Sequence, residues 1–551
     1  MLRCTGVIVV AMVSTSSSAW AELRVGAAAV EITPVLCDDA APDAGPEQFD
    51  SARNCFRWVH LAGFSPYVPF RRDNRLATGI HDPLWARALA IEGTNGETVV
   101  LIATDLPGLG SKHANRVRRR VEQSHGVPFT NVIIHSSHTH SAPDASGYWS
   151  TLMRGHNRRY TDQVRERVYE AIERALHTLQ PAEMKVATTT HLSCQDPRTR
   201  QLKADPDCHL PDINNQFDEI GEDFDQFVVQ RDQRDPIVRN TRIVAAEFSS
   251  PDGETIATLV NWHNHPDTLG SANSLISSDY PHYLRQYMEQ ARGGIAVYVV
   301  GTLGNQIGGL RGTPVPLWNE RRERVFAVSE PRHVDNEQKT RLPVLVTEGW
   351  DKIRSTGYEV AHAAVAALDT VRGSTDVAVE VRTQSIDTPV DNVIHLLTTW
   401  SVWHDDVAAD DRLRYYWPRC WGLLGCTRSD VSLVHIGELS FITAPGEIDP
   451  AYFLGRRASI ADYGGRWGTW RFPPMAGVDR NMPGTHHAVV GSANGYLSYM
   501  IPRADYVGWW NTGHPNHYED VVTIGKRFGD DVFRAWMDLL GATSGSTVSA
   551  P

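Results

Sequence analysis

The chain has 551 residues, of which 41% are hydrophobic, and this composition is typical of a globular protein with a large core. Its formal net charge of -12 argues against nucleic acid as a partner, because binding to a polyanion requires an excess of positive charge. The same charge disfavours contact with an anionic membrane surface only mildly.

The first 21 residues have the features of a secretory signal peptide. Arg3 supplies the positive start, the apolar run Val7–Val13 follows, and Ala19-Trp20-Ala21 fits the small-x-small cleavage pattern. The apolar run is too short to span a bilayer. We therefore expect a mature chain that begins near Glu22 and is secreted or periplasmic.

Predicted strands and helices alternate along the mature chain. Apolar runs predict strands at 98–103, 132–134, 256–260, 295–300 and 433–443, whereas helical spacing of apolar residues predicts helices at 164–176, 357–368 and 533–540. Strands separated by amphipathic helices favour a layered α/β fold. We expect one domain over residues 22–540 and a disordered tail at 541–551.

Six cysteines remain once the signal peptide, which carries Cys4, is removed. An even number of cysteines in an exported protein predicts disulfides. Six cysteines allow about 15 pairings, but their clustering favours three local pairs: Cys37–Cys55, Cys194–Cys208 and Cys420–Cys426. A cysteine metal site is the weaker alternative, because no two of them have CxxC spacing.

The segment NVIIHSSHTHSAPD, residues 131–144, contains a pair of histidines just after a predicted strand. In an extended backbone His138 and His140 project to the same side. Two imidazoles at a strand end can bind a metal or transfer a proton, and their small neighbours leave room for a ligand. Hydrogen-bonded structural histidines near a turn are an equally good interpretation of this motif alone.

Two other predicted strands lead to groups of the same kind. His265 follows the strand at 256–260, and Glu447 follows a Pro-Gly turn after the run at 433–443. Ligands converge at strand ends in α/β sheets, and two histidines with one carboxylate form a common zinc hydrolase site. Each residue also has a structural interpretation: a polar strand end for His265, a surface residue for Glu447, and core packing for the tyrosines of 491–499.

Taken together, these segments resemble the neutral ceramidase family, the neutral/alkaline non-lysosomal ceramidases. The resemblance rests on the order of short motifs between about residues 23 and 525, which read VGAAAVEITP at 25–34, GIHDPL at 79–84, HTHS at 138–141, LISSDY at 275–280, PGE at 445–447 and ANGYLSY at 493–499. It implies a layered α/β catalytic domain with a mixed β-sheet. It also implies a secreted zinc-dependent amidohydrolase that cleaves ceramide or a related N-acyl lipid.

The resemblance also implies roles for individual residues. Four positions match the family's zinc ligands: His138, His265, Glu447 and Tyr499. His140 matches a catalytic or substrate-contacting histidine, and Tyr518 in Asn516-His-Tyr-Glu519 matches a tyrosine that stabilises the reacting carbonyl. Arg198 in Asp196-Pro-Arg-Thr-Arg200 stands where the family has a site arginine.

The sequence departs from the family in two places. Gly304, in Gly301-Thr-Leu-Gly-Asn-Gln306, occupies the position of a serine tied to activity in the family. The chain also ends soon after the tyrosine segment, where family members continue into an immunoglobulin-like domain, so we expect that domain to be absent. Two alternatives therefore stay open: a metallohydrolase of the same scaffold acting on an ester, lactone or other N-acyl compound, and a non-catalytic binding protein. Nitrogen and oxygen ligands also accept divalent ions other than zinc.

Residues 415–426, YYWPRCWGLLGC, combine tryptophans and leucines with a predicted disulfide. Such a loop can contact an acyl chain or a lipid interface, which predicts peripheral membrane contact. An aromatic loop folded back onto the core is the alternative.

Overall fold

The computed structural model describes residues 22–38, 49–64, 75–149, 157–190, 238, 240–307, 315–328, 341–392, 426–462, 464–508, 510 and 517–541. Several expectations lie outside these residues: the signal peptide at 1–21, the Cys194–Cys208 pair, Arg198, the aromatic loop up to residue 425, and the tail from residue 542. Among the described residues, no helix is both long and apolar enough to cross a membrane.

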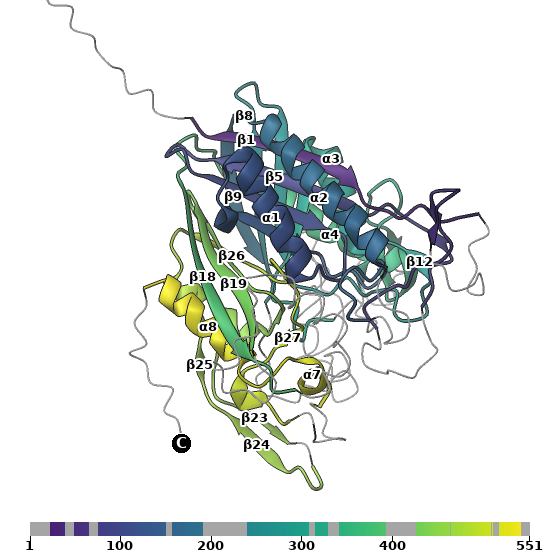
Figure 1. The fold of residues 1–551 in the computed structure, drawn as a ribbon, viewed down its shortest axis with the longest axis vertical. Coiled ribbons are helices and arrows are strands. Elements are labelled where there is room, and N and C mark those ends of the chain that lie inside the picture. The colour runs from purple at the N-terminus through teal and green to yellow at the C-terminus, as the bar shows by residue number, and fades with distance from the viewer. Residues whose placement is uncertain are drawn as a thin grey trace, which may run out of the picture.

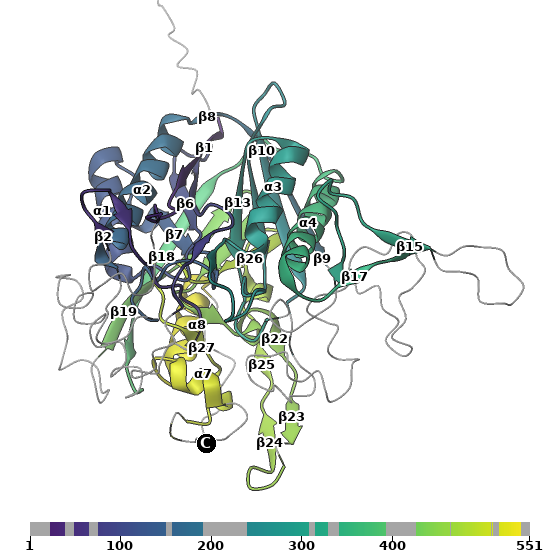
Figure 2. The same cartoon turned by 90° about the vertical axis from the view of Figure 1, so that its right-hand side faces the viewer.

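Two packed β-sheets with helices on both outer faces form the centre of the molecule (Figures 1 and 2). The first sheet has the order β7-β6-β5-β1-β8 and the second β13-β11-β10-β9. Their strands are β1 (Arg24–Glu31), β5 (Trp85–Glu92), β6 (Thr98–Thr104), β7 (Val132–Ser136), β8 (Gln180–Pro181), β9 (Glu183–Thr190), β10 (Arg242–Ser249), β11 (Thr255–Trp262) and β13 (Ile295–Val300). Both sheets contain parallel and antiparallel pairs, which confirms the predicted layered α/β fold with mixed sheets.

Helices cover the outer face of each sheet. Figure 2 shows α1 (Ser111–His125) and α2 (Arg158–His177) beside the first sheet, and α3 (Tyr280–Arg292) and α4 (Gly349–Leu368) beside the second. The predicted helix at 164–176 is confirmed as part of α2, whose buried stripe includes Val164, Val168 and Ile172.

The alternation of side chains along β5 and β6 explains why most residues of these strands are apolar. Ala90 pairs with Val100, and both pack toward the helices, whereas Leu89 pairs with Leu101, and both pack toward the second sheet. Because both faces are covered, interior positions on these strands are mostly apolar. The exception on β5 is Arg87, which forms an ion pair with Glu289. Gly26 on β1 lets α2 approach closely, since a Cβ there would lie 2.1 Å from a carbonyl oxygen of α2.

A third sheet, of order β18-β19-β20-β26, packs against α8 (Phe528–Leu539). Its strands are β18 (Val379–Pro389), β19 (Cys426–Ile436), β20 (Leu439–Thr443) and β26 (His486–Val490). The prediction of one strand over 433–443 is wrong, because a turn at Gly437 divides this run into the β19–β20 hairpin. Gly437 has φ of 56°, a conformation that glycine adopts without a steric penalty.

Short elements connect these layers and carry the loops of the candidate site. They are β2 (Phe49–Asp50), β3 (Cys55–Phe56), β4 (Gly79–Ile80), β12 (Leu275–Ile276), β14 (Val315–Pro316), β15 (Phe326–Val328), β16 (Arg341–Pro343), β17 (Leu345–Val346), β21 (Glu447–Ile448), α6 (Pro450–Leu454), β22 (Gly455–Arg456), β23 (Ser459–Asp462), β24 (Thr469–Phe472), β25 (Met475–Ala476), β27 (Tyr499–Met500), α7 (His517–Val522) and the 3-10 helices η1 (Phe129–Asn131), η3 (Asp479–Asn481) and η4 (Arg503–Asp505). The β23–β24 hairpin projects from the body (Figure 1).

The predicted disulfide between Cys37 and Cys55 is confirmed. Cys426 is also disulfide-bonded. Disulfides are typical of proteins that fold in oxidising compartments, so these bonds agree with the expectation of an exported chain.

Candidate active site

Loops at the ends of strands from different sheets meet in one buried site. His138 lies two residues after β7, and His265 lies three residues after β11. Glu447 begins β21, which pairs with β27 in a separate parallel sheet. Ring nitrogens of His138, His140 and His265 all lie within 4.8 Å of one another, although the residues come from distant parts of the chain.

His138 is held in a single orientation by the backbone. Its N–H donates to the carbonyl of Leu106 at 2.9 Å, and its Nδ1 lies 2.5 Å from the carbonyl oxygen of Pro107. A carbonyl only accepts, so Nδ1 carries the proton and Nε2 presents a lone pair to the site. Burial lowers the pKa of His138 to about 4, although Glu447 partly opposes this effect, so the ring is neutral near pH 7.

The predicted reason for the proximity of His138 and His140 is wrong, although the two rings do meet. β7 ends at Ser136, and His138 has φ of 66°, so the pair does not belong to an extended strand. Nε2 of His140 nevertheless lies 3.2 Å from Nε2 of His138. The left-handed turn at His138, rather than strand periodicity, brings the rings together.

Glu447 bridges the imidazoles of His138 and His265. Its Oε2 lies 2.9 Å from Nε2 of His265 and its Oε1 lies 3.5 Å from Nε2 of His138. Nδ1 of His265 faces the carbonyl oxygen of Gln306 at 3.1 Å, as Nδ1 of His138 faces that of Pro107. Burial alone would raise the pKa of Glu447, but the two histidines and a tyrosine hydroxyl outweigh burial and lower it. Burial likewise opposes protonation of His265, and the neighbouring carboxylate outweighs it and raises its pKa.

Two tyrosines from the 491–499 segment contribute to the site. Glu447 and Tyr499 are direct partners in the parallel β21–β27 pair, which places the two buried residues side by side. Burial and the charge of Glu447 raise the pKa of Tyr499 well above its usual range. Tyr496 donates a hydrogen bond from its hydroxyl to Oε1 of Glu447, and its ring stacks on His138 with centroids 5.2 Å apart.

Sequence reasoning did not single out Tyr496, although it lies three residues before the predicted ligand Tyr499. The backbone carbonyls of Pro107 and Gln306 were also missed, because no residue type is required for a main-chain acceptor. The spacing of the two tyrosines was the one available signal. Its interpretation required knowledge that Glu447 lies between them and the histidines.

His140 differs from the other histidines in its hydrogen bonding. Its backbone N–H donates to the carbonyl of Pro266 at 2.9 Å, but its Nδ1 is buried without a hydrogen-bond partner in the described part of the chain. Gly63, with φ of 104°, packs against the ring, and a Cβ at this glycine would lie 2.3 Å from Cγ of His140. The ring is thus held closely while one nitrogen remains available for a ligand.

A small cavity of about 20 Å³ lies between these groups, which is space for about one water molecule. It is lined by Gly63, His138, His140, Trp149, Glu447, Tyr496, Ser498, Tyr499, Tyr518 and Val522. Tyr518 on α7 is 40% exposed, and its ring centroid lies 6.0 Å from that of Tyr499. Six of the seven residues predicted from the sequence therefore lie in or around one site, and the seventh, Arg198, lies outside the described residues.

The donor atoms of this site fit a divalent metal ion. His138 and His265 each present Nε2 while a backbone carbonyl fixes Nδ1, an arrangement common among metal-bound histidines. The set of nitrogen and oxygen donors suits zinc and other transition metals. The proximity of the ring nitrogens would make His140 a ligand beside His138 and His265. The family resemblance instead assigns Tyr499 as a ligand.

Gly304 is not among the residues that line the cavity. Its N–H donates to the carbonyl of Ile448 at 3.0 Å. A Cβ at this position would lie 2.9 Å from the carbonyl carbon and oxygen of Ile448 and 3.0 Å from the oxygen of Glu447. Position 304 is thus packed against the main chain that carries Glu447.

The packed α/β sheets and the buried His-Glu-Tyr cluster define a protein with a candidate metal-dependent hydrolase site. The chain is similar to the neutral ceramidase family over part of its length: the family model described as neutral/alkaline non-lysosomal ceramidase, N-terminal, matches residues 65–208. No curated protein sequence matches the chain.

Two solved structures share the fold over most of the chain. The neutral ceramidase from Pseudomonas aeruginosa superposes with a TM-score of 0.57 at 17% sequence identity, covering 95% of this chain and 74% of that one. A structure described as ceramidase complexed with C2 gives a TM-score of 0.57 at 17% identity, covering 95% of this chain and 75% of that one. At this identity the likeness shows the fold.

Proposed function

We propose that this chain is a secreted zinc-dependent amidohydrolase that cleaves the amide bond of ceramide or a related N-acyl lipid. The observation that carries the proposal is the convergence of three buried imidazoles, a carboxylate and two tyrosines on one site, in a chain that is similar to the neutral ceramidase family. One similar structure is described as a ceramidase complexed with C2, which supports this class of substrate. The disulfides support secretion.

Zinc in this site would be held by Nε2 of His138, Nε2 of His265, the carboxylate of Glu447 and the phenol oxygen of Tyr499. When bound, zinc would act as a Lewis acid and lower the pKa of a water from about 15.7 toward about 7. The carbonyls of Pro107 and Gln306 keep the two imidazoles in the correct tautomer, and Tyr496 orients Glu447.

His140 and Tyr518 would act on the substrate. The low pKa of buried His140 leaves its ring neutral near pH 7, so it can accept a proton from the attacking water and return it to the leaving amine. This return is essential for an amide, because an amine leaves poorly unless it is protonated. Tyr518, at the edge of the cavity, donates a hydrogen bond to the oxyanion that develops on the carbonyl.

Metal content and turnover in single variants test the assignment. His138→Ala should lose both zinc and hydrolysis, whereas His140→Ala should keep zinc and lose hydrolysis. Tyr499→Phe should weaken zinc binding, which distinguishes the proposed ligand set from the three-histidine set. His177→Ala, an exposed histidine on α2, is the matched control and should behave as wild type. Stoichiometric zinc and full turnover in His138→Ala would reject the assignment.

A second candidate is a hydrolase of the same scaffold with another substrate, such as an ester, lactone or N-acyl amino acid. Gly304 favours this candidate, because a glycine cannot supply the hydroxyl found in the family at that position. Hydrolysis of short esters or N-acyl amino acids without hydrolysis of ceramide would support it. Bound zinc without turnover on any of these substrates would instead indicate a binding protein.

A further inference from the structure

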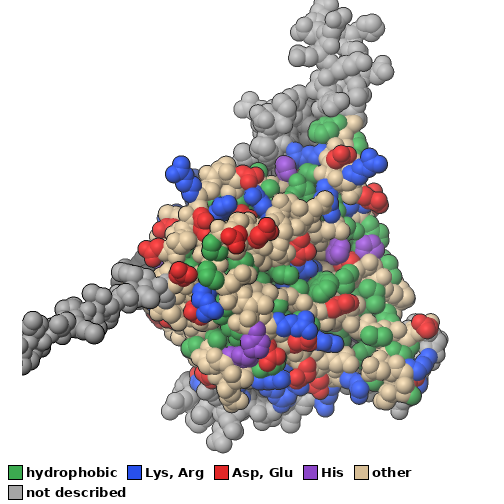
Figure 3. Space-filling view, turned by 90° about the horizontal axis from the view of Figure 1, so that it is seen from above, with side chains coloured by type: hydrophobic (Ala, Val, Ile, Leu, Met, Phe, Trp, Pro, Cys, Tyr) green, Lys and Arg blue, Asp and Glu red, His purple; other side chains and the backbone are tan. Residues whose placement is uncertain are grey.

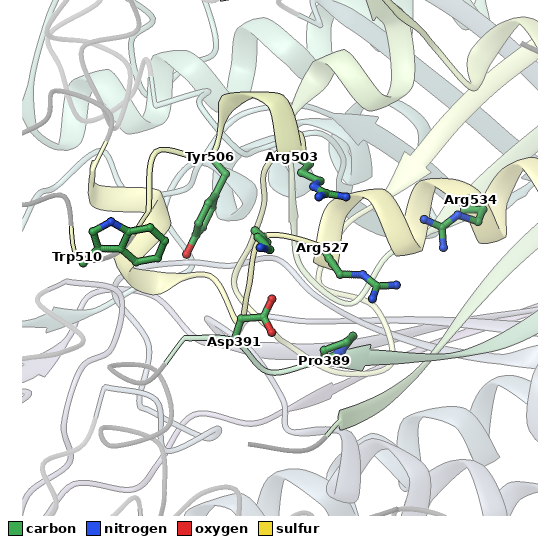
Figure 4. A pocket seen from close by; sticks show the side chains of 8 residues that line it. Pro389, Asp391, Arg503, Tyr506, Trp510, Arg527 and Arg534 are labelled. Carbon is green, nitrogen blue, oxygen red and sulfur yellow. The ribbon is translucent and has the colours of Figure 1, made fainter. Parts of the chain in front are cut away.

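A larger cavity, of about 440 Å³, opens at the start of α8 (Figure 4). The end of β18, the η4 region and the turn that leads into α8 surround it. It is lined by Pro389, Asp391, Arg503, Tyr506, Trp510, Lys526, Arg527 and Arg534. None of these residues lines the small catalytic cavity, so the two cavities are separate features.

Positive charge is concentrated in this second cavity. Four of its lining residues are cationic and one, Asp391, is acidic. Behind them, a carboxylate oxygen of Asp531 lies 3.5 Å from a guanidinium nitrogen of Arg527 and 3.2 Å from one of Arg534, and Asp530 accepts a hydrogen bond from the backbone N–H of Arg503. The four cations therefore exceed these carboxylates and Asp391 by one. The whole chain has a net charge of -12, and on the face in Figure 3 both signs are interspersed. A local excess of cations is unfavourable unless an anion compensates it.

The cationic groups are free to contact a ligand. The side chains of Arg527 and Arg534 remain 45% and 60% exposed despite their contact with Asp531. In the described part of the chain, the side chains of Arg503 and Lys526 donate no hydrogen bond. Arginine matches the oxygens of a phosphate or sulfate group with two parallel hydrogen bonds.

Two aromatic side chains form the opposite side of the cavity. Figure 4 shows Tyr506 and Trp510 on one side and Arg527 and Arg534 on the other. The rings of Tyr506 and Trp510 meet edge to face with centroids 6.4 Å apart, and Trp510 is 64% exposed. A large aromatic surface beside a cationic cavity suits a ligand that combines an anionic group with an organic part.

We propose that this cavity is a binding site for a phosphate or sulfate monoester, with the anionic group on Arg503, Lys526 and Arg527 and the organic part against Trp510. Such a group occurs both on small soluble molecules and on lipid headgroups. The proposal rests on this cavity alone and does not depend on the proposed hydrolase activity.

Calorimetric titration with inorganic phosphate tests the site, with chloride at equal ionic strength as the reference. A second measurement follows sedimentation with phosphatidylcholine vesicles that contain or lack phosphatidic acid. The test variant is Arg503→Ala combined with Lys526→Ala. Its matched control is Arg457→Ala combined with Arg471→Ala, which removes two exposed arginines that do not line the cavity. Melting temperatures should be unchanged in both variants.

We expect saturable binding by wild type and the control variant, and binding weaker by about tenfold or more in the test variant. Loss confined to the phosphate titration identifies a soluble ligand, whereas loss of vesicle binding identifies a lipid headgroup, and either result supports the proposal. It is overturned if wild type binds neither phosphate nor the anionic vesicles. It is equally overturned if the test and control variants bind alike.

Discussion

Gly304→Ser provides a sharp test, because the family resemblance and the structure predict opposite results. Restoring the family's serine would raise activity if the missing hydroxyl were the only difference. In the structure, however, a Cβ at position 304 would lie 2.9 Å from the main-chain carbonyl of Ile448 and 3.0 Å from the main-chain carbonyl oxygen of Glu447. Ordinary contacts between carbon atoms are about 3.5 Å, so this main chain would have to move by about half an ångström.

The cost of this movement can be estimated. Overpacking of a filled site destabilises a protein by about 1–3 kcal/mol, which for a chain of this size lowers Tm by about 1–3 °C. Because the displaced main chain carries the proposed ligand Glu447, we also expect zinc affinity to fall by about 10–100-fold. Gly304→Ala should have the same effects, since the clash arises from the Cβ.

Thermal melting and competition for zinc with a chromophoric chelator measure both effects. Gly79→Ala is the matched control, because a Cβ there meets only the end of the Leu275 side chain, at 3.1 Å. The reasoning is refuted if Gly304→Ser retains wild-type Tm and zinc affinity, and most clearly if it gains activity.

Three further predictions concern other parts of the structure. Tyr496→Phe removes a hydrogen bond to Glu447 and should weaken zinc binding by about 10–100-fold in the same chelator assay, with no change in Tyr287→Phe. Replacing both Cys37 and Cys55 with Ser should lower the free energy of unfolding in urea by about 3 kcal/mol, because their disulfide closes a short loop; an unchanged value would contradict this. Burial raises the pKa of Asp520 to about 8, so the protonated carboxyl is favoured in the folded state. The stability that this proton contributes is lost as pH rises from about 4, the usual pKa of an aspartate, through about 8. Melts of wild type and Asp520→Asn should therefore diverge over this pH range, with the variant losing less stability toward alkaline pH.

Much of the fold follows from local sequence patterns. The run at 295–300 coincides with β13, and the stripe at Val164, Val168 and Ile172 marks the buried face of α2. Period-2 and 3.6-residue patterns suffice at these positions because burial dictates them. The run at 433–443 was misassigned because its residues are apolar on both sides of a turn, and one glycine with positive φ decides where the chain reverses.

The candidate site was only partly predictable. Short motifs indicate His138, His265, Glu447 and Tyr499 because their side chains carry the chemistry. The support for these residues comes from tertiary contacts: main-chain carbonyls orient the imidazoles, and Tyr496 orients the carboxylate. Likewise, Arg503 and Lys526 show no sequence pattern, since only the fold brings η4 beside the start of α8.

The most direct test of the account is a crystal structure of the zinc-loaded protein with anomalous data at the zinc edge. We predict one peak about 2.0–2.2 Å from Nε2 of His138, Nε2 of His265, an oxygen of Glu447 and the phenol oxygen of Tyr499. A peak bound by His140 in place of Tyr499 would contradict the ligand set, and the lack of any peak in this cavity would contradict the proposed metal centre itself.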